Sequence, residues 1–255
     1  MKKYLAAALM FTAAQLVPAP VAQAQQATPP APIEAFYCNF QDGKGMKDLQ
    51  AVADRLKTWA AKNDPTYSAW ILTPVFGIGK QLPQVVWLGS NPNGNAFGKG
   101  LSAWLATGGD IQAAFDTVVD CSMGHFLASS TEINAPEGTP DDGVVMFSQC
   151  KLAQGSDFNK AVDAHKKLSQ EMRALGTKGS SWAFWPMLGG GDIKFDYWGV
   201  TTFNSWQDYF DAYEVYVNGG GWQKFAQHLG GTTSCMQPTP TVWNVNLVRK
   251  GDGQR

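Results

Sequence analysis

FYCNF (36–40), MKDLQAVADRLKTW (46–59), YSAWILTP (67–74), VVWLG (85–89), DIQAAFDTVVDC (110–121) and FLASSTEI (126–133) follow one another in the first half of the chain. A second series occurs in the same order: VMFSQC (145–150), DFNKAVDAHKKL (157–168), SWAFWP (181–186), FDYWG (195–199), WQDYF (206–210) with WQKFAQHL (222–229), and VWNVNLV (242–248). Such self-similarity is typical of an internal repeat. The sequence therefore predicts two copies of one structural unit, at 34–134 and 144–250.

Matching landmarks recur in the two series. They are Cys38 with Cys150, Cys121 with Cys235, Asp48 with Asp157, Trp70 with Trp182, Pro74 with Pro186, Gly89 with Gly199 and Phe115 with Phe225. In this alignment His165 stands opposite Leu56. The segment NGNAFGKG (93–100) has no counterpart in the second copy, so we interpret it as an insertion loop.

Periodicity assigns the elements within each copy. Apolar residues from Leu49 to Ala60 recur at helical spacing, whereas Trp243, Val245 and Leu247 alternate with asparagines, as in a strand. Each copy is therefore expected to be a β-α-β-β-α-β unit, which is the ferredoxin-like pattern. The predicted fold class is α+β, with two tandem ferredoxin-like units.

Two such units in one chain resemble the dimeric α/β-barrel superfamily in a tandem, duplicated form. The resemblance rests on element order and duplication, and it implies that the two units form one pseudo-dimeric barrel. The superfamily includes cofactor-free monooxygenases, haem-degrading enzymes, haem peroxidases and chlorite dismutases, and its members hold flat or apolar ligands between sheet and helices. Carried over by analogy, the resemblance implies a similar cavity here. No cofactor is expected, and haem is the alternative.

Residues 1–24 have the composition of a secretory signal peptide. Lys2 and Lys3 precede a short apolar stretch, and Ala22–Ala24 form an A-x-A cleavage site. The apolar stretch is shorter than the roughly 20 residues that a membrane-spanning helix needs. The sequence thus predicts an exported protein, periplasmic or secreted, with a flexible leader at 25–33 and a turn-rich linker at 135–143.

Four cysteines in an exported chain predict two disulfides, for which three connectivities exist. If each unit is self-contained, the pairs are Cys38–Cys121 and Cys150–Cys235. Ferredoxin-like topology agrees, because the first and last strands of a unit lie side by side and antiparallel. No close cysteine spacing indicates a metal site instead.

The formal net charge is −1, and it becomes −3 when Lys2 and Lys3 leave with the signal peptide. Such a balance argues against nucleic acid or an anionic membrane surface as a partner. A small apolar or aromatic molecule is the expected partner. Because the fused units satisfy the usual dimer internally, a monomer or pseudo-dimer is expected.

Three histidines are candidates for chemistry. His165 lies on the apolar face of its helix, where it could bind a ligand, act as a base or hold haem, or be a hydrogen-bonded core residue. The position of His228 resembles the helix-end histidine that holds haem iron in the haem-degrading proteins, although a histidine there also suits the helix dipole. His125 is interpreted as a rim residue.

Aromatic and amide side chains are the second candidate group. Trp70 and Trp185 belong to a set of aromatics on the middle strands that suits a flat apolar ligand, or else fills the core. Asn244 lies in the last strand. Asparagines, with tryptophan and histidine, surround the aromatic substrate in the cofactor-free monooxygenases that the chain resembles; solvated or inter-unit contacts are the alternative.

Standard catalytic motifs are absent from the sequence. It contains no G-x-S-x-G, H-E-x-x-H or EF-hand pattern, and NGNAFGKG does not satisfy the phosphate-loop pattern. The sequence therefore predicts binding of a small apolar or aromatic ligand in a barrel cavity and leaves open whether the protein is an enzyme. The alternatives are a cofactor-free monooxygenase acting on an aromatic compound, or a haem-binding or haem-processing protein.

Overall fold

The computed structural model describes residues 28–77, 82–134, 142–236 and 238–252. The predicted signal peptide and most of the predicted linker lie outside these residues. The first strand begins at Ala31, three residues inside the predicted leader.

The first half contains four strands and three helices. They are β1 (Ala31–Phe40), α1 (Met46–Asn63), β2 (Ser68–Phe76), β3 (Val85–Ser90), α2 (Gly94–Thr107), α3 (Gly109–Asp116) and β4 (Val119–Asn134). The second half repeats this order with its last strand interrupted. Its elements are β5 (Gly143–Leu152), α4 (Phe158–Ala174), β6 (Ser180–Leu188), β7 (Tyr197–Phe203), α5 (Trp206–Val217), α6 (Gly221–Leu229), β8 (Thr233–Ser234) and β9 (Thr241–Arg249).

Two helices, not the single predicted one, connect the third and fourth long strands of each half. The interpretation of 93–100 as an insertion loop is wrong, because Asn93 caps α2 by accepting a hydrogen bond from the backbone N–H of Ala96. Ser205 caps α5 in the same way, through the N–H of Asp208. Glycines separate the paired helices, and Gly220 between α5 and α6 has a φ of 85°, a conformation that favours glycine.

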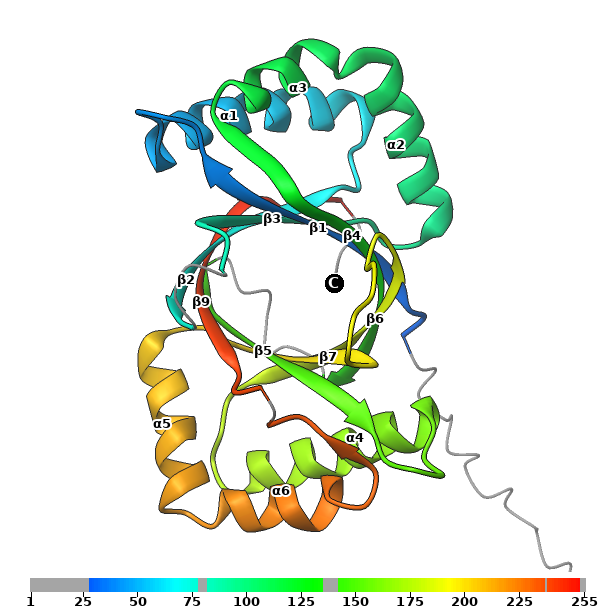
Figure 1. The fold of residues 1–255 in the computed structure, drawn as a ribbon, viewed down its shortest axis with the longest axis vertical. Coiled ribbons are helices and arrows are strands. Elements are labelled where there is room, and N and C mark those ends of the chain that lie inside the picture. Colours follow the sequence, from blue (N-terminus) through cyan, green and yellow to red (C-terminus); the bar gives the residue numbers. More distant parts are fainter. Residues whose placement is uncertain (1–27, 78–81, 135–141, 237, 253–255) are drawn as a thin grey trace, which may run out of the picture.

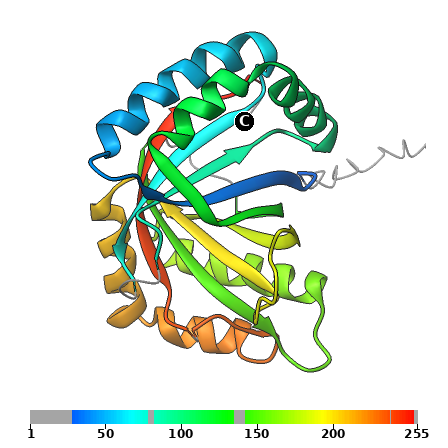
Figure 2. The same ribbon diagram turned by 45° about the horizontal axis from the view of Figure 1, so that its top comes forward.

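The strands form one antiparallel sheet that closes on itself (Figures 1 and 2). The order within the first half is β4-β1-β3-β2, and within the second half it is β9-β5-β7-β6. The edge strands of one half pair with those of the other, β4 with β6 and β2 with β9. Eight of the strands described thus make a closed barrel, and the short β8 adds to β5.

The barrel interior is filled by apolar side chains. Ile33, Leu72, Val145, Phe184 and Trp243 belong to this cluster, which we call the barrel core. An eight-stranded barrel is just wide enough for side chains to fill its centre. The remaining apolar strand residues face outward, where α1–α3 cover the first half and α4–α6 cover the second (Figure 1).

Two disulfides join the chain as the sequence predicted. Cys38 is bonded to Cys121 and Cys150 to Cys235. Cys121 lies in β4 rather than at the end of the preceding helix, where the sequence placed it. No helix in the described part of the chain is long and apolar enough to cross a membrane.

We expect the Cys38–Cys121 disulfide to stabilise the fold by restricting the unfolded chain, since it joins residues 83 positions apart. Replacing both cysteines with serine should lower the free energy of unfolding by about 2–4 kcal/mol. Urea titration of the oxidised protein measures this difference. An unchanged midpoint in the double variant would contradict the expectation.

Candidate functional site

The second half contains a pocket of about 210 Å³ on the outer face of the barrel wall. It lies between β5, β6 and β7 on one side and α4, α5 and α6 on the other. Its described lining is apolar or aromatic apart from hydroxyl groups and one imidazole, and it includes no Asp, Glu, Lys or Arg. Leu168, Phe203, Tyr213 and Phe225 are typical of it.

The strand ladders explain why the pocket is in the second half. Corresponding positions in β1, β3, β5 and β7 follow from the disulfide cysteines, because Cys38 pairs with Val85 and Cys150 with Tyr197. Two residues earlier in β1, Phe36 pairs with Trp87. At the same place in the second half, Ser148 pairs with Gly199. Two aromatic side chains are thus replaced by a serine and a glycine.

A third aromatic residue of the first half, which immediately precedes β2, also has no aromatic counterpart in the second half. Tyr67 precedes β2 and donates a hydrogen bond to Glu34 Oε1 at 2.9 Å, while Trp87 Nε1 donates to its hydroxyl at 3.0 Å. The residue that precedes β6 is Gly179. Phe36, Tyr67 and Trp87 pack into the helix–sheet core of the first half. Ser148, Gly179 and Gly199 line the pocket in the second.

The halves correspond at a constant separation of 112 residues through these elements (38 and 150, 46 and 158, 87 and 199). The predicted match of Gly89 with Gly199 is therefore wrong by two residues. The predicted match of Asp48 with Asp157 is wrong by three, because Asp157 is the N-cap of α4 whereas Asp48 lies in the first turn of α1. His165 consequently corresponds to Ala53, not to Leu56.

His165 projects from α4 into the space left beside Gly199. A Cβ atom added at Gly199 would lie 3.2 Å from Cys150 Sγ and 3.8 Å from His165 Cε1. In the first half the corresponding positions are occupied by Trp87 on the strand and the small Ala53 on the helix, and both belong to the helix–sheet core. Glycine on the strand thus leaves room for both the imidazole and the pocket.

A chain of three hydrogen bonds fixes the His165 ring. His165 Nε2 lies 2.8 Å from the hydroxyl of Tyr197, which donates to Thr233 Oγ1 at 2.9 Å. Thr233 in turn donates to the carbonyl oxygen of Lys151 at 2.9 Å. Tyr197 is fully buried and Thr233 nearly so.

Burial lowers the pKa of His165 to about 4 and raises that of Tyr197 to about 12. Removing a charged group from water is unfavourable, so each group resists ionisation. Both side chains are therefore neutral at pH 7. The imidazole presents an uncharged polar atom in apolar surroundings.

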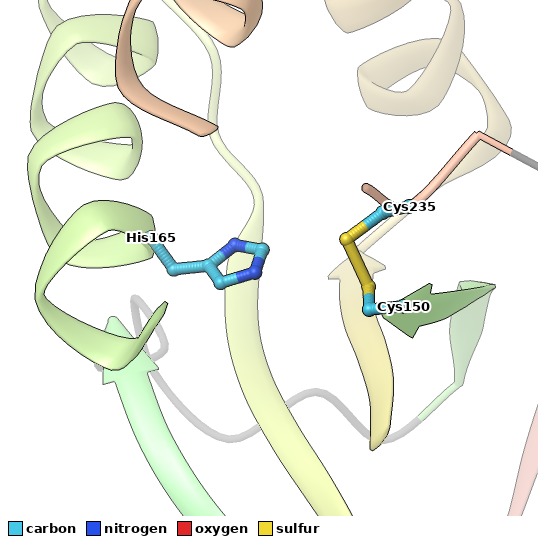
Figure 3. A group of neighbouring side chains, drawn as sticks. All are labelled: Cys150, His165 and Cys235. Atoms are coloured by element: carbon cyan, nitrogen blue, oxygen red, sulfur yellow. A yellow bond between two sulfur atoms is a disulfide. The ribbon is translucent and has the colours of Figure 1, made fainter. Parts of the chain in front are cut away.

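The Cys150–Cys235 disulfide lies beside the imidazole (Figure 3). The two sulfurs and a ring nitrogen of His165 lie within 4.8 Å of one another. Thiolates, not disulfide sulfurs, are the usual metal ligands of cysteine. Because these sulfurs are bonded to each other, the group acts as part of the pocket wall, to which Cys235 contributes.

The other predicted site residues do not line this pocket. Trp70 belongs to the barrel core. Trp185 is stacked on the far side of the site against Tyr197, with ring centroids 4.4 Å apart. Asn244 accepts a hydrogen bond from Trp206 Nε1 at 3.4 Å. Of the five predicted ligand-binding residues, the structure places only His165 in the pocket.

His228 lies away from the pocket, next to Lys167, Gln170 and Glu171 of α4. Its Nε2 atom is 3.9 Å from Glu171 Oε1, too far for a hydrogen bond. His125 stacks on Phe36 at a centroid distance of 3.7 Å, and its side chain is half exposed.

Sequence reasoning missed Ser148, Gly179, Thr233 and, as a site residue, Gly199. Small residues carry no chemical signal of their own. The constant spacing of 112 residues would have revealed them, since it aligns three of them with aromatic residues of the first half.

The lining residues fit an uncharged ligand better than haem. His165 is the only imidazole in the described lining, and its Nε2 is engaged with Tyr197. Haem also carries two propionates, and buried charges need partners. No lysine or arginine faces the pocket in the described part of the chain.

Comparisons with known proteins identify the fold. No family model matches the sequence, and no curated protein matches it. A protein from Fusobacterium nucleatum provisionally named a monooxygenase is 8% identical, with a TM-score of 0.57 over 90% of this chain and 97% of its own. Another from Lactobacillus acidophilus is 10% identical, with a TM-score of 0.52 over 87% and 95%.

A mutant chlorite dismutase from Candidatus Nitrospira defluvii is 8% identical, with a TM-score of 0.51 over 86% of this chain and 92% of its own. At such low identities the likeness is one of fold alone. The chain has the fold of the dimeric α/β-barrel superfamily, which its sequence resembles.

The lowered pKa of His165 predicts a specific pH dependence of stability. Between pH 6.5, its ordinary pKa, and about pH 4, the unfolded chain binds the proton more readily than the folded chain. The contribution of His165 to stability is therefore complete above pH 6.5 and is lost as the pH falls toward 4.

Wild-type protein should accordingly lose about 3 kcal/mol more unfolding free energy than His165→Leu between pH 7 and pH 4, since each pKa unit corresponds to about 1.4 kcal/mol. Urea titrations of both proteins across this range measure the difference. Parallel pH profiles would contradict the buried, neutral imidazole.

Proposed function

We propose that this protein binds one small, uncharged, largely apolar molecule in the pocket beneath α4, α5 and α6. The observation that carries the proposal is the loss of three aromatic side chains at matching positions. Phe36, Tyr67 and Trp87 pack the first half, whereas Ser148, Gly179 and Gly199 line a pocket in the second. Unfilled apolar volume is costly in a protein core, so a ligand that fills it would be stabilising.

The lining supports an aromatic or compact apolar ligand. Aromatic side chains from three elements line the pocket, among them Phe203 of β7, Tyr209 of α5 and Phe225 of α6. Their rings favour stacked or edge-to-face contact with another ring. A volume of about 210 Å³ is slightly below the roughly 300–1,000 Å³ of typical ligand pockets, which favours a molecule of one or two rings.

The proposal includes the architecture and the compartment expected from the sequence. Residues 34–134 and 144–250 would be tandem ferredoxin-like units, in support of which the two halves have the same strand order. The first unit would be packed for structure and the second hollowed for a ligand. Signal-directed export fits the two disulfides, and paired edges throughout the barrel favour a monomer.

Binding is a better proposal than catalysis by a cofactor-free monooxygenase. A general base works best when its pKa lies near the working pH. The pKa of His165 is about 4, so the imidazole would be a weak base at pH 7. Oxygen uptake in the presence of a bound ligand would favour the enzyme instead. A Soret band on adding haemin, lost in His165→Leu, would favour the haem alternative.

The test places in the pocket, at Ser148, the phenylalanine that the first half has at the corresponding position, Phe36. With 2-naphthol as a neutral two-ring probe, wild-type protein should bind one molecule per chain by calorimetric titration. Ser148→Phe should weaken binding at least about tenfold, because the added ring occupies the pocket and overpacking of this kind costs about 1–3 kcal/mol.

The control is Ser102→Phe, the same substitution at an exposed position of α2. It should leave the affinity unchanged, and circular dichroism should show both variants folded. Should Ser148→Phe not fold, Ala212→Phe on α5, which also lines the pocket, replaces it. No binding by wild type, or equal binding by pocket and control variants, would refute the proposal.

A further inference from the structure

We infer that the pocket selects ligands that carry a hydrogen-bond donor, and that His165 Nδ1 is the atom that receives it. This inference rests on the proposed ligand-binding function and narrows its ligand class to small apolar molecules with one hydroxyl or N–H group. The juxtaposition behind it is a neutral imidazole, held from outside the pocket by Tyr197, Thr233 and the Lys151 carbonyl.

The direction of the hydrogen bonds determines where the imidazole proton is. The Lys151 carbonyl can only accept, so Thr233 gives it its one hydroxyl proton. Thr233 Oγ1 must then accept a hydrogen bond from the Tyr197 hydroxyl, which donates its single proton to it. Tyr197 has no proton left for the ring. His165 Nε2 must therefore carry the hydrogen and donate it.

A neutral imidazole has one donor and one acceptor nitrogen. With the proton on Nε2, Nδ1 has a lone pair and can only accept. Nδ1 has no hydrogen-bond partner among the described residues, and it is not sealed inside the protein. Because His165 lines the pocket, we assign the open side of Nδ1 to the ligand space.

No other polar group of the described lining discriminates in this way. Ser148 and Thr201 offer hydroxyls, which rotate and can serve either a donor or an acceptor, whereas the Ser181 hydroxyl is enclosed by protein. No charged side chain faces the pocket to attract an anion or a cation. Only the acceptor on His165 penalises a ligand that lacks a donor, because filling the pocket would leave its lone pair unsatisfied and without water.

A matched pair of probes tests the selection. 2-Naphthol and 2-methylnaphthalene have nearly the same shape, but only the first has a donor, and the second is more apolar. Burial alone would favour 2-methylnaphthalene. We expect wild-type protein to bind 2-naphthol about tenfold to a hundredfold more tightly, measured by ligand-induced change in tryptophan fluorescence.

His165→Leu should remove the preference by weakening 2-naphthol binding while leaving 2-methylnaphthalene binding intact or tighter. Tyr197→Phe tests the positioning role of Tyr197: it frees the proton to occupy either nitrogen, and the preference should shrink without a change for 2-methylnaphthalene. If His165→Leu does not fold, His165→Gln replaces it; its amide can donate or accept, so the preference should fall below that of wild type.

The outcomes separate the inference from the function it rests on. If neither probe binds, the proposed function fails. If both bind wild type equally, the pocket stands and the donor requirement is overturned. If the preference for 2-naphthol persists undiminished in the folded His165 variant, the assignment to His165 is overturned.

Discussion

Backbone pairing between the two halves is the constraint on which the rest of the structure depends. A four-stranded sheet has two open edges, which are sites of aggregation unless they are covered or paired. Here β4 pairs with β6 and β2 pairs with β9, so each half closes the other. Closure turns one face of every strand inward, where apolar side chains form the barrel core. The pocket, in which the two halves differ, lies on an outer face, under the helices.

The outer faces show how one packing problem is solved in two ways. In the first half the strand supplies the large side chain, Trp87, and α1 supplies the small Ala53 at the position that corresponds to His165. In the second half the strand supplies Gly199 and the helix supplies His165, whose ring is shorter than an indole. The volume that remains is continuous with the space vacated at Ser148 and Gly179. A modest set of substitutions thus converts core into pocket without changing the strand pairing.

Much of the fold could be predicted from the sequence, because apolar periodicity and paired landmarks report directly on elements and topology. Such patterns predict the order of the long strands along the chain and the disulfide partners. They also place His165 on the helix face that packs against the sheet. The site was less predictable for a physical reason. Trp70 and Trp185 attract attention by their size, yet large aromatics are what a core requires, whereas the pocket is lined by Ser148 and Gly199. The predicted alignment of the two halves was also wrong in places, because matching glycines and aspartates were given more weight than the constant separation of 112 residues.

The most direct measurement is a crystal structure of the protein exposed to bromobenzene, a neutral apolar ring whose bromine can be located by anomalous scattering. Apolar cavities in proteins take up molecules of this kind. The packing predicts one bromine site per chain, between Phe203 and Leu168 in the second half, and none beneath α1–α3 in the first. An empty second-half pocket, or equal occupancy in both halves, would contradict the claim that small residues at three positions leave a ligand site in the second half.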